Sequence, residues 1–115
     1  MATEDERSRG RMNDSDYDVI QRNTPYLREQ LIGKDIVDIM FAKHIINRDQ
    51  VVEVDKQMKK SRPEGIRVLL GFLMDSGGVN AMEPFIECLN DAGFKHVADK
   101  LKRDRQVTAD AKYVD

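Results

Sequence analysis

Residues 81–101 read AMEPFIECLNDAGFKHVADKL, and this stretch carries the clearest folding signal in the chain. Its apolar residues recur mostly three or four positions apart, at Phe85, Cys88, Leu89, Ala92, Val97, Ala98 and Leu101. This is the spacing of residues that share one face of an α-helix. Asn80 and Glu83 have the spacing of a helix start, and Gly93 is of the residue type that ends helices. The stretch therefore predicts two short helices that meet near Gly93, each with one face to bury.

Four further segments upstream show the same helical period. Their apolar stripes fall within residues 16–31, 36–41, 47–58 and 61–73. The second of these segments is expected to bury one broad face made of Ile36, Val37, Met40 and Phe41. Six short helices with brief connections can hide their stripes only by packing on one another. The sequence therefore predicts an all-α fold, a six-helix antiparallel bundle.

Local residue pairs predict where these helices begin and bend. Thr24 directly before Pro25 combines an N-cap with a proline at the first helical position. The first helix is therefore expected to form two halves joined at a kink near residues 23–25, with Gly33 as its stop. Capping boxes, in which the N-cap and the residue three positions on satisfy each other's backbone N–H groups, are expected at Asn47 with Gln50 and at Ser61 with Glu64.

The composition narrows the class of protein. A chain of 115 residues suits one domain, and 6% aromatic residues without Trp disfavour a small β-barrel. The single cysteine cannot form an internal disulfide, no signal peptide begins the chain, and the apolar runs are too short to span a membrane. We therefore expect a cytoplasmic protein without membrane contact. Its domain is expected at residues 16–102, between disordered polar tails at 1–15 and 103–115.

The residues that carry chemistry are few. His44 and His96 are the two histidines, and neither they nor Cys88 have the spacing of a metal site. Cys88 lies on an expected buried face, where a free cysteine usually acts as a small apolar residue. No nucleophile, base and orienting group can be assembled. We therefore expect no enzymatic activity and no cofactor.

Charged residues are segregated along the chain, although the net charge is only −2. Residues 56–67 hold five bases against one acid, and residues 35–55 hold five acids against two bases. Such runs are often no more than solvated helix faces. As two separate patches of opposite sign, they also suit electrostatic docking of one protein on another. Together with a second basic stretch at residues 95–105, residues 56–67 keep a helical nucleic-acid binder open as a rival.

The chain from about residue 17 to residue 101 resembles the caspase recruitment domain (CARD), a six-helix member of the death-fold superfamily. The likeness rests on four stretches. The first is N-x-x-Y-L-x-x-x-L at residues 23–31, and the others are DIVDIM with AKHIIN at 35–47, RVLLGFL at 67–73, and the segment 81–101 quoted above. A kinked first helix is also a feature of this family.

The resemblance implies an adaptor function, because CARDs bind other CARDs. In many of them, basic residues of the first and fourth helices meet acidic residues of the second and third. Carried over by position, the basic side consists of Arg22, Arg28, Arg62 and Arg67, with Lys59 and Lys60 nearby. The acidic side consists of Asp35, Asp38, Asp49 and Glu53. Arg67 and Asp38 are the strongest candidates for direct contact.

Two patches on different sides of one molecule predict head-to-tail assembly into a helical oligomer. The expected partner is the CARD of a caspase, an apoptosome adaptor or an immune sensor, in apoptotic or innate-immune signalling. The chain is expected to be either the N-terminal piece of such a protein or a stand-alone CARD that acts as an inhibitory decoy.

Overall fold

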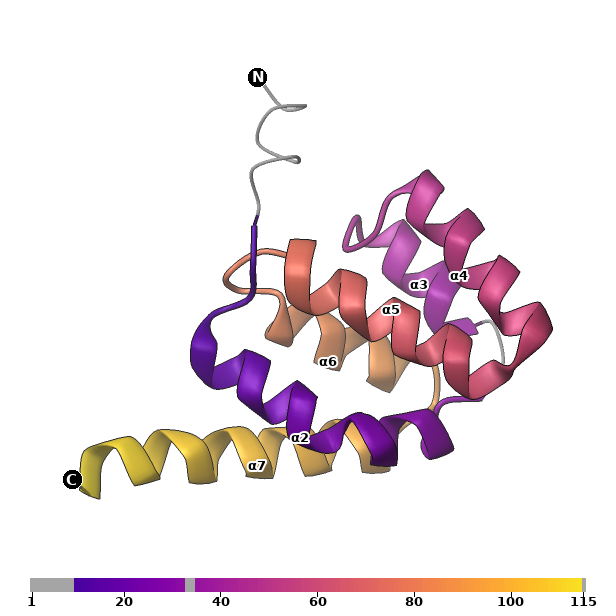
Figure 1. The fold of residues 1–115 in the computed structure, drawn as a ribbon. Helices are drawn as coiled ribbons and strands as arrows, with labels where there is room; N and C mark the ends of the chain where they lie inside the picture. The colour runs from indigo at the N-terminus through magenta and orange to yellow at the C-terminus, as the bar shows by residue number, and fades with distance from the viewer. Residues whose placement is uncertain (1–9, 33–34, 115) are drawn as a thin grey trace.

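The computed structural model describes residues 10–32 and 35–114, with side chains as far as residue 107. Within these residues the fold consists of six helices and contains no strand (Figure 1). The helices are α2 (Asp14–Gln30), α3 (Asp35–Ala42), α4 (Arg48–Lys60), α5 (Arg62–Ser76), α6 (Met82–Asp91) and α7 (Lys95–Val114). The predicted all-α fold of six helices is confirmed. In the part of the chain described, no helix has the length and apolarity needed to cross a bilayer.

The folded part of the chain begins before residue 16, where the domain was expected to start. The side chain of Asn13 caps α2 by accepting a 2.9 Å hydrogen bond from the backbone N–H of Asp16. Met12 is buried, and its backbone N–H donates to the carbonyl of Met74 at 2.9 Å. The disordered tail expected over residues 1–15 is therefore wrong for 10–15, which the core and α5 hold in place. Residues 1–9 lie outside the described part of the chain.

Helix α2 is one continuous helix of 17 residues with Pro25 inside it. Thr24 is not an N-cap, because its hydroxyl donates to the carbonyl of Ile20 within the same helix at 2.9 Å. The expected division into two half-helices is therefore wrong, whereas a kink in the helix axis stays a prediction. The stop expected at Gly33 lies outside the described residues.

The capping box at Asn47 is confirmed by hydrogen bonds in both directions with Gln50. At Ser61 the box is wrong, since the serine side chain makes no cap bond. Its intended partner Glu64 binds Arg67 instead. Pro63 still lies in the first turn of α5, where a missing N–H costs least.

Helices α4 and α5 pack closely because Gly65 is buried against Met58. A Cβ atom at Gly65 would lie 2.1 Å from the Met58 Cγ and 2.9 Å from its Cα. Only glycine allows the two helices to approach this closely. The contact brings the C-terminal end of α4, with Lys59 and Lys60, beside the first turn of α5.

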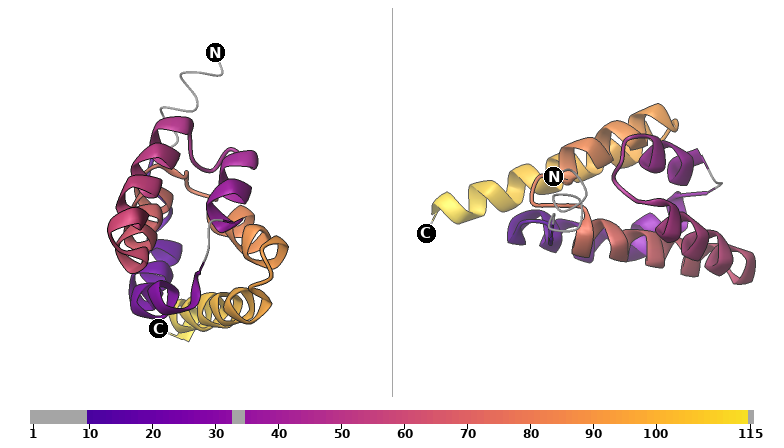
Figure 2. Two further views of the ribbon diagram at one scale, coloured as in Figure 1. Left: turned by 90° about the vertical axis from the view of Figure 1, so that its right-hand side faces the viewer. Right: turned by 90° about the horizontal axis from the view of Figure 1, so that it is seen from above.

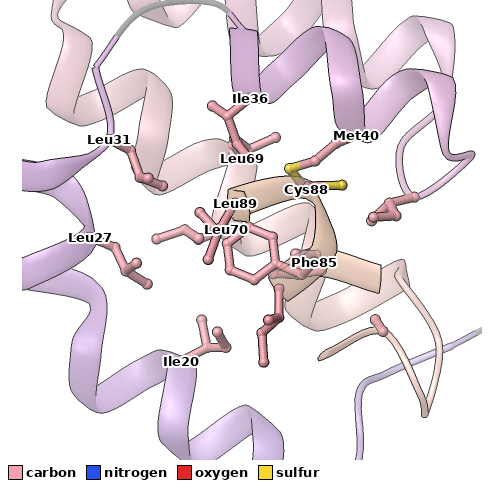
Figure 3. Close-up of a cluster of buried hydrophobic side chains, with 14 of the residues drawn as sticks. Ile20, Leu27, Leu31, Ile36, Met40, Leu69, Leu70, Phe85, Cys88 and Leu89 are labelled. Atoms are coloured by element: carbon pink, nitrogen blue, oxygen red, sulfur yellow. The ribbon is translucent and has the colours of Figure 1, made fainter. Parts of the chain in front are cut away.

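The core lies where α2, α5 and α6 meet, with α3 and α7 closing its sides. Figure 3 shows Phe85 and Leu89 of α6 beside Leu70 of α5, with Ile20 and Leu27 projecting from α2. All five are completely buried. One expected core residue is not part of it, because Phe41 on α3 is 45% exposed. Eight residues of α3 provide one narrow buried stripe, which Ile36, Val37 and Met40 already fill.

Helix α7 runs far beyond the expected end of the domain. It spans 20 residues and lies along α2 (Figures 1 and 2). The disordered tail expected at 103–115 is therefore wrong for residues 103–114, which are helical. The reason is that Asp104 and Arg105 bind residues of α2. Helices α3 and α4 lie at the opposite end of the molecule from α7 (Figures 1 and 2).

Candidate protein-interaction surface

The basic side gathers arginines from the end of α2 and the start of α5. Arg67 on α5 is 55% exposed and donates from Nε to Oε1 of Glu64 at 2.7 Å. Arg28 on α2 is 38% exposed, with its Nη2 4.0 Å from Oε2 of the same carboxylate. The hydrogen bond from Arg67, with the charges of both arginines, lowers the pKa of Glu64. One anion between two cations leaves this cluster with a net positive charge.

Arg62 has a structural role that the sequence pattern did not reveal. Its Nη1 donates to the carbonyls of Arg28 and Leu31, both at 2.8 Å. These carbonyls lie at the C-terminal end of α2, where backbone acceptors lack partners within the helix. Arg62 therefore satisfies the end of α2 and joins it to the start of α5. Arg62 therefore has two roles, because it holds the backbone of Arg28 in place and also contributes a positive charge.

The other three predicted basic residues are less closely grouped. Arg22 lies on α2 with its Nε 2.9 Å from Oδ2 of Asp18. It precedes Arg28 by six residues, which places it about 120° away around the helix. The structure therefore does not bring Arg22 into the Arg28–Glu64–Arg67 cluster. Lys59 and Lys60 are exposed in the last turn of α4, next in the chain to α5.

A groove opens between α2 and α5 beside this cluster. Its volume is about 540 Å³, and its lining consists of Pro25, Tyr26, Arg28, Glu29, Arg62 and Pro63. Two prolines and a tyrosine ring contribute apolar surface, and the two arginines outnumber the single acid among these lining residues. Neither the groove nor its tyrosine was identified from the sequence, because a groove arises only where two helices meet.

The acidic side lies on α3 and the first half of α4. Asp35, Asp38 and Asp49 are exposed, and Glu53 is half-buried. The amide of Gln57 donates to Oε2 of Glu53 at 3.0 Å. In the described part of the chain, none of these four carboxylates lies in an ion pair with a lysine or arginine. The two predicted sides therefore do not neutralise each other within one molecule.

Part of the charge segregation on α4 has a purely local cause. Asp49 occupies the first turn of this helix, and Lys59 and Lys60 occupy the last. Acids near a helix N-terminus and bases near its C-terminus interact favourably with the helix dipole, typically by about 0.3–1 kcal/mol each. The same cause applies to Asp35 and Asp38, which lie in the first turn of α3. It does not apply to Arg67, which lies in neither the first nor the last turn of α5.

The second basic stretch, residues 95–105, is largely neutralised within the molecule. Lys95 pairs with Asp99 at 3.0 Å and Lys100 with Asp104 at 2.8 Å. Arg105 binds the buried Asp16 at 2.9 Å and lies 3.6 Å from Glu83. A nucleic-acid site needs cations that can contact phosphates. The rival nucleic-acid hypothesis therefore loses three of the five cations of this stretch, whereas the exposed lysines of residues 56–67, on which it also rested, are unaffected.

Of the three side chains that could carry chemistry, Cys88 is buried in the core and the two histidines are exposed. Cys88 is completely buried, and desolvation raises the pKa of its thiol to about 11, which keeps it in the unreactive thiol form. His96 lies 3.0 Å from the Gln30 side-chain oxygen, and His44 is exposed in the turn after α3. Over the described residues, no three side chains of the metal-binding types form a cluster.

Comparison with known proteins assigns the family. The family model of the caspase recruitment domain matches residues 17–104, which is most of the chain. A search of curated proteins gave no match. The matched residues extend from α2 into α7 and include all ten residues predicted for the basic and acidic sides. CARDs act by homotypic protein–protein interaction in signalling. This chain belongs to the caspase recruitment domain family.

Proposed function

We propose that this CARD is an adaptor module whose basic side, at the end of α2 and the start of α5, docks on the acidic side of a second CARD. The proposal rests on the exposure of the acidic side and on its lack of ion pairs within the described residues. Asp35, Asp38 and Asp49 are exposed, and the described residues offer them no cation. Each of the three lies in the first turn of its helix, where the helix dipole stabilises a carboxylate modestly, and its exposure leaves it accessible to the cations of a partner.

The geometry favours head-to-tail contact. The arginines of the basic side lie on α2 and α5, whereas the acids lie on α3 and the first half of α4. A molecule that docks through one side can therefore still present the other. Such a heterologous contact repeats into an open helical assembly when its rotation does not close a ring. The partner is a second copy or the CARD of a caspase, an apoptosome adaptor or an immune sensor in the cytoplasm. Signalling then results from the local concentration of attached domains.

Static light scattering across protein and salt concentration tests this function. The scattering mass is expected to rise with protein concentration at low salt and to fall as salt screens the contact. A decoy would instead stop at a one-to-one complex with its partner and would not extend further. A monomer at every concentration, both alone and with other CARDs, would contradict the proposal.

Charge-reversal variants assign the surface. Arg67→Glu and Asp38→Arg are each expected to abolish assembly while the melting temperature stays nearly unchanged, because both residues are exposed. Arg103→Glu on α7 and Glu87→Arg on α6 are matched controls, since both change the same charge at exposed positions outside the two sides. Equal effects of test and control variants would mean that net charge alone governs assembly.

A further inference from the structure

The large apolar side chain Phe41 is exposed on the acidic side. It is 45% exposed, although its type and helical position predict burial. It lies three residues after Asp38 on α3, and this spacing places the two on one face of the helix. The acidic side therefore presents a carboxylate with an aromatic ring one turn away. Binding by charge alone would not require an exposed aromatic ring at this position.

The groove on the basic side has the complementary character. Its lining combines the apolar Pro25, Tyr26 and Pro63 with two arginines and one acid, which are Arg28, Arg62 and Glu29. The Tyr26 ring is steadied from another side by Lys100, whose Nζ lies 5.2 Å from the ring centroid. Arg62 fixes the end of α2 through two backbone carbonyls. The groove is therefore formed before any partner arrives.

Charge complementarity distinguishes Phe41 from Val52, the exposed apolar residue of the neighbouring helix α4. Val52 on α4 is 62% exposed and follows Asp49 by one turn, but Arg48 and Lys56 flank it four residues away on each side. These two bases would meet the arginines of the groove. Within α3, by contrast, the charged neighbours of Phe41 are acidic. Lys43, just beyond the helix, lies 3.4 Å from Asp91 of its own molecule.

We propose that Phe41 of one copy inserts into the groove between α2 and α5 of the next copy, with Asp38 facing Arg28 and Arg67. This inference rests on the head-to-tail function proposed above and names its apolar anchor. Phe41 does not line the groove of its own molecule, so the contact joins two copies. Rigid aromatic residues in preformed pockets supply much of the affinity of protein interfaces, and surrounding charges mainly steer the approach.

The anchor has a consequence for salt dependence. Salt screens the charge pairs but does not weaken the burial of an aromatic ring. Assembly of the wild-type chain is therefore expected to keep a salt-insensitive part at high ionic strength. A contact made of charges alone would lose its affinity almost completely under the same conditions.

Substitution of Phe41 tests the anchor. Phe41→Ala is expected to raise the protein concentration needed for assembly by about 30-fold, the effect of losing one interface anchor. The salt-insensitive part of assembly should disappear at the same time. Val79→Ala removes an equally exposed apolar side chain from another part of the molecule and is expected to change neither. Thermal melting of each variant shows whether the fold is intact.

Cross-linking tests the position of the ring without removing it. Ala42→Cys lies beside Phe41, and Glu29→Cys lies in the groove lining. A short bismaleimide is expected to join the two variants when they are mixed, whereas Ala42→Cys mixed with Glu87→Cys should stay uncoupled. The native Cys88 is buried and does not interfere. Formation of the expected cross-link supports the insertion, and equal yields from both pairs would contradict it.

The outcomes separate this inference from the function on which it rests. If Arg67→Glu abolishes assembly while Phe41→Ala assembles like the wild type, the adaptor function stands and the insertion is wrong. If Arg67→Glu, Asp38→Arg and Phe41→Ala all assemble normally, the proposed docking surface itself is wrong. Loss of assembly in Phe41→Ala at unchanged melting temperature, together with the cross-link, supports both.

Discussion

The seam between α2 and α7 and the outer face of α3 and α4 use the same residue types in opposite ways. At the seam, Asp16 is 3% exposed and binds Arg105, which is 35% exposed. A second group joins Asn23, Lys100 and Asp104 by hydrogen bonds of 2.7–2.9 Å. On the outer face of α3 and α4, the carboxylates of Asp35, Asp38 and Asp49 are exposed to solvent.

The difference shows that the role of a charged segment depends on the neighbouring helices. Where they supply counter-charges, the segment stabilises the fold, and where they do not, its charges remain available for binding. Residues 95–105 and 56–67 are both basic in the sequence. In the first, acids of α7 and α2 pair with three of the five cations, and the bonds of Arg105 and Lys100 to α2 hold α7 against that helix. In the second, Glu64 neutralises only part of the charge and the remainder stays available. The predictions below test whether stability and assembly divide between these two regions.

The largest expected effect is the loss of the buried ion pair at the seam. Arg105→Ala leaves the Asp16 carboxylate buried without its cation, and we expect the free energy of unfolding to fall by about 3 kcal/mol. Urea denaturation measures the change. Arg103→Ala, two residues away and exposed, is the matched control and should stay within about 0.5 kcal/mol of the wild type. Equal losses in both variants would show that the pair does not fasten α7.

The pH dependence of stability is the next largest effect at the seam. A hydrogen bond from Lys100, with a second from Asn23, lowers the pKa of Asp104. The folded state therefore binds this proton less tightly than the unfolded state does. The resulting stabilisation is present above the ordinary aspartate pKa of about 4 and is lost as the pH falls through the lowered value.

Asp104→Asn should therefore be less stable than the wild type near neutral pH, and the difference should shrink in acid. Asp99, whose pKa is lowered by a hydrogen bond from Lys95, lies in a more exposed pair. Asp99→Asn is expected to show the same trend with a smaller amplitude, because solvent screens exposed pairs. A constant difference between Asp104→Asn and the wild type from neutral to acid pH would contradict this account.

The smallest expected effect concerns assembly alone. Glu64 lies between Arg28 and Arg67 and cancels part of their charge. Glu64→Gln should strengthen assembly by up to about fivefold, the size expected from one exposed ion pair. Glu87→Gln on α6 makes the same charge change elsewhere and should have no such effect. Weaker assembly in Glu64→Gln would mean that Glu64 itself contacts the partner.

The six helices could be predicted from the sequence because their signals are local. Apolar spacing and the Asn47 cap depend on residues within one or two turns. The length of α7 could not be predicted, because its polar end is held by Arg105 binding Asp16, 89 positions earlier in the chain. Periodicity also could not place Phe41, since a residue at the edge of an apolar stripe can face either way.

The sequence predicted which charged residues are exposed on the candidate surface, but not which hydrogen bonds and ion pairs they form. Exposure of Asp35, Asp38 and Asp49 follows from their positions opposite the apolar stripe of their helices. The bonds of Arg62 to the end of α2 and of Arg67 to Glu64 depend on which helices meet, which one sequence does not show. For this reason the basic side contains both a residue that positions its neighbours, Arg62, and a residue proposed to contact the partner, Arg67.

The most direct test of the docking account is a mixture of Arg67→Glu and Asp38→Arg. Each variant alone places like charges at its own contact and should stay monomeric. Mixed, the intact Asp38 of the first can meet the intact Arg67 of the second, while the two reversed residues form a swapped pair. Light scattering of the equimolar mixture is therefore expected to show assembly that neither variant shows alone. A mixture that scatters as the sum of two monomers would contradict the account.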